Sequence, residues 1–124
     1  MAALRVSGST LRVVLSPLER LGAFVGRDPE VPLGAVSAVR VSADAWRELR
    51  GIRAPGTGIP GVIALGTRRS KAGRDFAAVY GHRPAVVVEL QGAAYGRFVV
   101  SAANADAIAT EIAQLLASAK PGRG

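Results

Sequence analysis

The densest group of chemically active side chains is a set of cations between residues 47 and 83. Eight Arg and Lys residues fall in this segment, opposed only by Glu48 and Asp75, so it holds nearly all of the net charge of +7. A guanidinium presents a planar fork of donors that matches phosphate and carboxylate groups. The segment therefore predicts an anion-binding surface, and its candidate ligands are Arg47, Arg50, Arg53, Arg68, Arg69, Lys71 and Arg74.

The same cations have a plainer interpretation. The chain contains fourteen Arg and two Lys, together with abundant Ala, Gly and Val, a bias that a GC-rich coding sequence produces by itself. On this interpretation the arginines only solvate the surface. Both interpretations stay open at the level of sequence.

A glycine-rich run, Gly56-Thr57-Gly58-Ile59-Pro60-Gly61, matches the G-x-G-x-x-G fingerprint of dinucleotide-binding sites letter for letter. That site needs a strand before the motif and a helix opening at its end, so that helix N–H groups meet the pyrophosphate. Here Pro60 lies inside the motif and a strand-like run follows, so no such site is expected. We expect a loop over 53–61, in which backbone N–H groups form a candidate anion nest at Gly56, Gly58 and Gly61.

Candidates for catalytic chemistry are few. The chain has one histidine, His82, and no cysteine, which excludes multi-histidine and thiolate metal sites and a cysteine nucleophile. No carboxylate is spaced to orient His82, and the G-x-S-x-G motif is absent. We expect a solvated turn histidine, no catalytic residue, no metal and no cofactor. The alternative is a small enzyme or small-molecule-binding protein with a pocket lined by Tyr80, His82 and arginines.

Alternating apolar and polar residues predict about seven β-strands, most of them joined as hairpins. After the second strand, Ser16-Pro17-Leu18-Glu19 has the form of a capping box, which predicts one or two helical turns. Leu18, Leu21 and Phe24 fall on one face of those turns. Asp44 opens a second short helical segment, in which we expect Trp46 to anchor the core. The expected strands cover 4–7, 10–15, 36–41, 62–67, 75–80, 85–90 and 95–100, with a polar turn at 68–73.

The period of the apolar residues changes near the end of the chain. Ile108, Ile112, Leu115 and Leu116 recur at the spacing of one helical stripe, which predicts an amphipathic C-terminal helix that Pro121-Gly122 ends. A stripe of this kind must be buried against the sheet, so the helix is expected to be integral to the fold.

Length and composition predict one domain. The chain has 124 residues, 49% of them hydrophobic, and we find no repeat or linker, so we expect a single domain over 1–120 and a flexible tail over 121–124. Arg5 and Arg12 interrupt the first apolar stretch, which argues against a signal peptide. No apolar run reaches the roughly 18–20 residues of a membrane-spanning helix. We therefore expect a cytoplasmic protein.

Segments along nearly the whole chain resemble a small uncharacterised group of bacterial pleckstrin-homology-like (PH-like) proteins. The resemblance lies in VPLGAVSAVRV, APGTGIPG and GRDFAAVY, followed by AVVVEL, YGRFVVS and the helix. It implies a mainly β fold, a strongly bent antiparallel sheet or partly open barrel of about seven strands, capped by one C-terminal amphipathic helix. It also implies a non-catalytic binding module, acting through protein–protein contacts or a basic anion-facing surface.

The expected partner is therefore a protein or an anionic ligand, with nucleic acid and a membrane surface as further candidates for the cations. The apolar strands over 85–90 and 95–100 belong to a sheet whose edges must be paired, covered or charged. A homodimer through a sheet edge, or through the Ala-rich face of the C-terminal helix, would meet that need.

Overall fold

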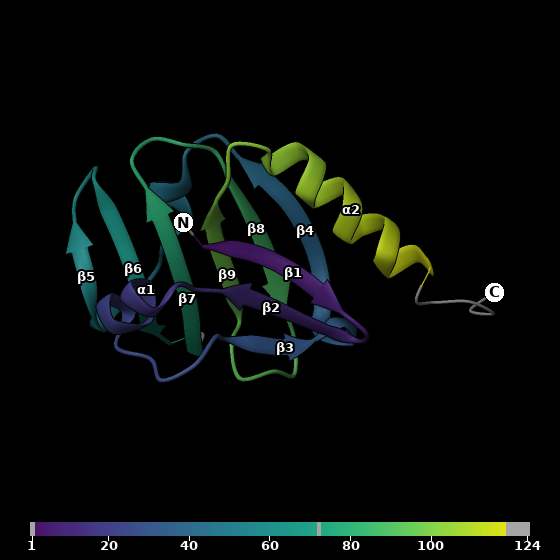
Figure 1. Ribbon diagram of the computed structural model, residues 1–124, viewed down its shortest axis with the longest axis horizontal. Helices are drawn as coiled ribbons and strands as arrows, with labels where there is room; N and C mark the ends of the chain where they lie inside the picture. Colours follow the sequence, from purple (N-terminus) through teal and green to yellow (C-terminus); the bar gives the residue numbers. More distant parts are fainter. Residues whose placement is uncertain (1, 72, 119–124) are drawn as a thin grey trace.

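The computed structural model describes residues 2–71 and 73–118, so the expected tail over 121–124 and the helix stop at Pro121-Gly122 lie outside the described residues. The fold is mainly β with a C-terminal helix, as expected (Figure 1). Its elements are β1 (Ala3–Ser7), β2 (Thr10–Val14), α1 (Pro17–Ala23), β3 (Glu30–Pro32), η1 (Leu33–Ala35), β4 (Val36–Ser42), η2 (Ala45–Glu48), β5 (Ile52–Ile59), β6 (Ile63–Ser70), β7 (Gly73–Tyr80), β8 (Ala85–Leu90), β9 (Arg97–Ser101) and α2 (Ala105–Ser118).

The described strands form two open sheets and no closed barrel. One sheet has the order β1-β2-β3, and the other has the order β4-β8-β9-β7-β6-β5. Neighbouring strands are antiparallel except β7 and β9, which run parallel. In Figure 1 the small sheet lies across one face of the large sheet, and α2 runs beside β4 at the end of the molecule opposite β5.

The main core lies between the two sheets and under α2. Its fully buried side chains include Leu11 and Val13 of β2, Phe76 of β7 and Phe98 of β9. The predicted apolar stripe of α2 faces this core, and its central residue, Ile112, is only 3% exposed. The helix is therefore integral to the packing, because removing it would uncover β4 and β8.

A second, smaller core covers the opposite face of the six-stranded sheet. Val79, Val87 and Val99 are buried there beneath the segment that contains η2, with Trp46 and Leu49 packed against them. The Trp46 indole N–H donates to the carbonyl of Gly81 at 2.9 Å. Trp46 thus anchors this core, as expected.

The structure corrects the expected loop over 53–61. Residues Ile52–Ile59 form β5, the edge strand of the large sheet, paired with β6 through a register shift between Arg53 and Gly56. An edge position and a β-bulge accommodate the Pro and Gly residues that made this segment look irregular. A Cβ added to Gly56 would lie 2.7 Å from the carbonyl oxygen of Leu65, so close strand approach explains this glycine.

The expected polar turn over 68–73 is also shorter than the sequence suggested. β6 continues to Ser70 and β7 begins at Gly73, so Arg68 and Arg69 belong to a strand. Backbone pairing across the hairpin outweighs the polar character of these side chains, which need only project from the sheet. With β3 and β5 added, the described chain has nine strands where about seven were expected.

Candidate functional site

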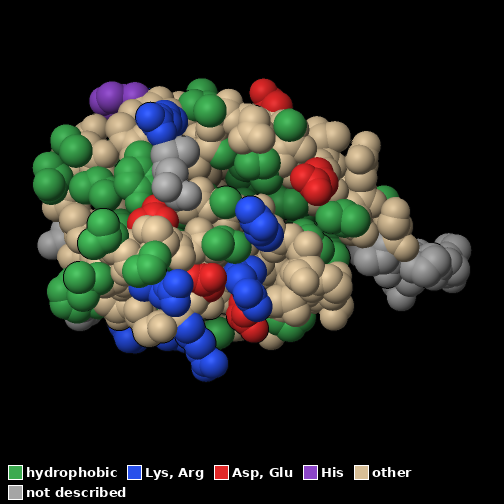
Figure 2. Space-filling view, viewed as in Figure 1, with side chains coloured by type: hydrophobic (Ala, Val, Ile, Leu, Met, Phe, Trp, Pro, Cys, Tyr) green, Lys and Arg blue, Asp and Glu red, His purple; other side chains and the backbone are tan. Residues whose placement is uncertain are grey.

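Five large apolar side chains are exposed at one end of the molecule. Their exposed fractions lie between 53% and 79%, and we call the set the apolar end: Leu18, Leu21, Phe24, Ile59 and Val62. Figure 2 shows green side chains gathered along this end, over α1 and the β5–β6 hairpin at the left of the view. Contiguous exposed apolar surface of this kind marks interaction sites on folded proteins.

The two parts of the apolar end lie on one face of the sheet. Thr57 is paired with Leu65 and Ile59 with Ile63, and both β6 partners pack against the main core. Cross-strand partners project on the same side, so Thr57 and Ile59 project on the side that carries α1. The Thr57 hydroxyl confirms this by donating to the carbonyl of Gly22, in α1, at 2.8 Å.

The orientation of α1 exposes its apolar face. The predicted capping box is present: the Glu19 N–H donates to Ser16 Oγ at 3.1 Å and the Ser16 N–H donates to Glu19 Oε1 at 2.9 Å. However, the helix buries Glu19 and Ala23, while Leu18 and Leu21 face solvent. Helical spacing predicted that these leucines share a face, but it carried no signal that the face points outward.

A partly buried hydrogen bond helps to hold this orientation. The Tyr80 hydroxyl, at the end of β7, donates to Glu19 Oε2 in the first turn of α1. Burial opposes ionisation of Glu19, but the pKa of this carboxyl lies below its ordinary value, and the hydrogen bonds from the Ser16 N–H and the Tyr80 hydroxyl are the two largest causes that lower it. Burial and the neighbouring carboxylate raise the pKa of Tyr80. The pair is therefore a carboxylate and a neutral phenol at neutral pH.

Phe24 ends α1 in a left-handed conformation, with φ +59° and ψ +39°. It is the one described residue other than glycine with positive φ. Glycine normally takes this position, because a Cβ there costs roughly 1 kcal/mol. The Phe24 ring is exposed, so burial within the chain does not offset that cost. A strained, exposed aromatic residue is a feature that packing of the chain on itself leaves unexplained.

Three of the seven predicted anion ligands have partners within the chain, two of them in partly buried positions. Arg50 forms a bidentate pair with the buried Asp75, with Nε–Oδ2 2.6 Å and Nη2–Oδ1 3.1 Å. Arg68 donates to the carbonyls of Arg50 and Gly51. Arg47 pairs with Asp44 at 3.2 Å on the surface. Arg50 and Arg68 therefore tie the segment that covers the second core to β6 and β7, whereas the Arg47 pair is local to η2.

A neighbouring charge network, which the sequence did not predict, fixes the same segment. Arg40 and Arg97 both contact Glu89, and Arg40 also contacts Glu48 at 2.6 Å. The Arg97 Nη1 group donates to the carbonyl of Glu48 at 2.8 Å. The Arg40 hydrogen bond lowers the pKa of Glu48 against the opposing effect of burial. The only signal for this network is that Glu89 and Arg97 lie opposite each other on β8 and β9. That signal could be used only once the pairing of the two strands was known.

Three of the predicted cations remain exposed around the β6–β7 turn: Arg69, Lys71 and Arg74. Arg69 and Arg74 face each other across the two strands, a like-charge pairing that is unfavourable. Within the described residues, none of the three forms an ion pair with a carboxylate. Arg74 instead lies over the Tyr95 ring, 5.1 Å from its centroid, in a pocket that Arg27 also lines. The side chain of Arg53 lies outside the described part of the structure.

The glycine nest that the sequence offered as a candidate does not form. Gly56 and Gly58 lie in β5, paired with Gly66 and Ala64. Of the three glycines only Gly61, in the hairpin turn, has positive φ, at +77°. A nest needs successive N–H groups that converge, and an extended strand directs them to alternate sides.

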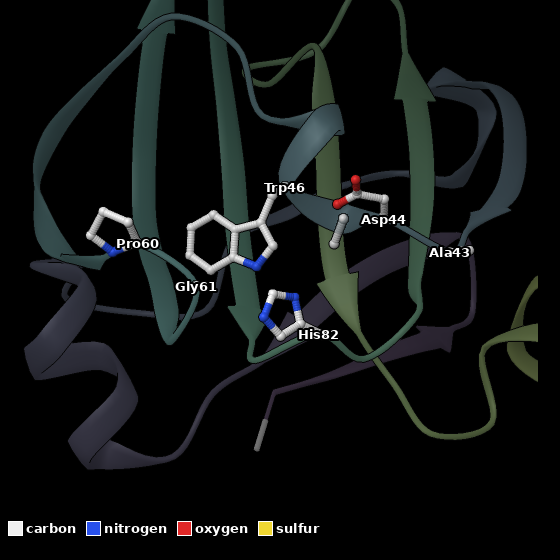
Figure 3. A pocket seen from close by; sticks show the side chains of 7 residues that line it. Ala43, Asp44, Trp46, Pro60, Gly61 and His82 are labelled. Carbon is white, nitrogen blue, oxygen red and sulfur yellow. The ribbon is translucent and has the colours of Figure 1, made fainter.

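His82 is exposed on the turn between β7 and β8, as expected, and lines a pocket of about 610 Å³ with Trp46, Pro60 and Asp44. Figure 3 shows the Trp46 ring between Pro60 and His82, and the Asp44 carboxylate turned away from the imidazole. Neither Tyr80 nor an arginine is among the residues that line this pocket. The grouping of Tyr80, His82 and arginines that an enzyme or small-molecule site would need is therefore not found there.

Among the described residues, no group of three His, Cys, Asp or Glu side chains could hold a metal ion. No helix in the described part of the chain has the length and apolar composition needed to cross a membrane. No protein-family model, curated protein or solved structure matches this chain. The apolar end is the feature that stands out from ordinary packing, so we treat it as the candidate functional site.

Proposed function

We propose that this protein is a non-catalytic binding module of the PH-like type, which acts through protein contacts made by the apolar end. One observation carries the proposal: five large apolar side chains are exposed together, and one of them, Phe24, is held in a left-handed conformation. Exposure of this surface costs solubility, and the conformation costs folding stability. A binding partner that covers the surface would offset both.

The way α1 is held supports this proposal. Glu19, Thr57 and the capping residue Ser16 fix the helix on the sheet through buried or half-buried polar contacts. The apolar side chains are therefore presented on a rigid base rather than on a mobile loop. A preorganised surface binds with a smaller entropic penalty than one that must be ordered.

A photo-crosslinking residue at position 21 tests the proposal. We expect p-benzoylphenylalanine in place of Leu21 to form protein adducts in cells that express the variant. The same residue in place of Thr110, on the exposed side of α2, is the matched control, because it adds an equal apolar surface far from the apolar end. Equal labelling from positions 21 and 110, or none from position 21, would contradict the proposal.

A second candidate function is binding of an anionic ligand at the β6–β7 turn. The observation that favours it is the contrast between Arg40, Arg50 and Arg97, which have carboxylate partners, and the exposed Arg69 and Arg74. An anion between two facing guanidinium groups would relieve their repulsion.

Binding of heparin at low salt tests this second function. We expect affinity to fall steeply between 50 and 300 mM salt, since exposed charges are screened over about 8–10 Å near physiological ionic strength. Joint substitution of Arg69 and Arg74 by Glu should abolish binding, whereas joint substitution of the exposed Arg5 and Arg47 by Glu, which changes the net charge equally, should reduce it little. Equal binding by the two variants would show that net charge alone attracts the polyanion.

A further inference from the structure

We infer that the partner of the apolar end is a second copy of this chain, bound through the outer edge of β5 and the exposed face of α1. This inference rests on the proposed function. It names a symmetric dimer in which β5 pairs antiparallel with β5 of the other copy. The two α1 helices then lie side by side on the same face of one continuous sheet.

The edge of β5 makes the pairing possible. Among the described strands, β5 pairs only with β6, so its outer N–H and C=O groups face away from the sheet. Such an edge is a template for another strand. The first half of β5 is protected by Pro55 and the register shift before Gly56, but Thr57–Ile59 carries no such device. The unprotected half is the half that adjoins the apolar end.

Symmetry brings the apolar surfaces together without further adjustment. A two-fold axis perpendicular to the sheet generates antiparallel pairing of a strand with its own copy. Because Ile59 projects on the side that carries α1, and α1 contacts both β5 and β6, the same axis puts the two α1 helices on one face of the joined sheet. On this arrangement we infer that Leu21 and Phe24 meet their counterparts. The surface is self-complementary, as an isologous interface requires.

The exposed apolar area approaches that of one side of a dimer interface. Five side chains of this size, each more than half exposed, present on the order of 500 Å² of apolar surface. Backbone and small side chains of the β5 edge bring one side toward the roughly 800 Å² per partner found in stable complexes. The pockets described above are lined mainly by other residues. The apolar end is thus suited to pack against the surface of a folded protein rather than to hold a peptide in a groove.

Charge is consistent with a second copy. The chain carries a net charge of +7, so two copies repel each other through most of their surfaces. The apolar end contributes no charged side chain, and Arg20, next to Leu21, is paired with Asp28 at 3.7 Å. It is therefore a region in which like chains can meet without facing cations.

Sedimentation velocity of the parent chain over a concentration series tests the inference. We expect a monomer–dimer equilibrium that reaches mainly dimer by about 300 μM. Leu21→Asp should raise the dissociation constant at least about 30-fold, the effect of a buried charge at a central contact. Thr110→Asp, which adds the same charge on α2, should leave the constant unchanged.

Phe24→Gly provides a second variant, one that we expect to leave the fold stable. Glycine relieves the left-handed strain while it removes the aromatic contact. We therefore expect an unfolding midpoint for dilute monomer equal to or above that of the parent, together with a weaker dimer. A dimer unaffected by both Phe24→Gly and Leu21→Asp would overturn the assignment of the interface.

The remaining outcomes separate this inference from the proposed function. A parent that stays monomeric at about 300 μM, with crosslinking from position 21 to a different protein, overturns the dimer and leaves the proposed function intact. A monomer that binds phosphatidylcholine vesicles through Leu21, without protein adducts, overturns both. Adducts from position 21 with twice the mass of the chain support both.

Discussion

The Tyr80 hydroxyl donates a hydrogen bond to the carboxylate of Glu19, joining the end of β7 to the first turn of α1 across 61 positions of sequence. Glu19 also accepts from the Ser16 N–H, so one carboxylate closes the capping box and docks the helix. Together with the Thr57 hydrogen bond to Gly22, this acid sets the orientation of the apolar end. This role of Glu19 leads to the first two predictions.

Tyr80→Phe should lower the free energy of unfolding by about 1.5–3 kcal/mol, because a buried carboxylate loses a hydrogen-bond donor. Chemical denaturation followed by the fluorescence of the single tryptophan, Trp46, measures the change. Tyr95→Phe is the matched control, since Tyr95 contributes its ring to contacts with Phe76 and Phe98. Equal losses for the two variants would show that the Glu19 hydrogen bond contributes nothing.

Acid should destabilise the parent more than it destabilises Glu19→Gln. The pKa of Glu19 is lowered from its ordinary value of 4.5, so its contribution to stability is present above that value and is lost as pH falls through the folded-state pKa. Urea denaturation at a series of pH values below 7 measures this dependence. Glu111→Gln, on the exposed side of α2, should follow the parent curve. Identical acid profiles for the parent and Glu19→Gln would contradict the assignment.

Asp75→Ala should cost about 2–4 kcal/mol of folding free energy, because it leaves the partly buried Arg50 guanidinium without its partner. Thermal and urea unfolding measure the loss. Asp44→Ala removes a carboxylate from the exposed pair with Arg47 and should cost less than about 1 kcal/mol. A cost for Asp75→Ala no larger than for Asp44→Ala would show that the buried pair does not hold the segment around η2.

Gly56→Ala should destabilise the β5–β6 hairpin, since the new Cβ would lie 2.7 Å from the carbonyl oxygen of Leu65. Backbone on both sides must shift, which we expect to cost about 1–3 kcal/mol. Amide hydrogen exchange in β5 should be faster in Gly56→Ala than in the parent. Gly34→Ala is the control, because open space surrounds its Cβ position and its φ is ordinary. An unchanged exchange rate in β5 would refute the close-approach explanation.

The sequence by itself determined the elements whose signals are local. Strand alternation placed β4, a short apolar run placed β8, the capping residues placed α1, and the stripe around Ile112 placed α2 and its buried face. Each of these signals depends on neighbours within about one or two turns of helix, or a few residues of strand, so it can be read without the fold.

Only the tertiary structure decided what these elements do together. β5 exists because β6 supplies its hydrogen bonds and an edge tolerates its proline, and neither fact is local. Arg50 was expected to face a ligand, but Asp75, 25 positions away, accepts hydrogen bonds from its Nε and Nη2 groups. Helical spacing placed Leu21 on an apolar face of α1. In the structure that face is exposed to solvent, because the opposite face of the helix, with Glu19, is hydrogen-bonded to Tyr80. Charge and hydropathy show which groups need partners, but only the long-range packing determines which partners they find.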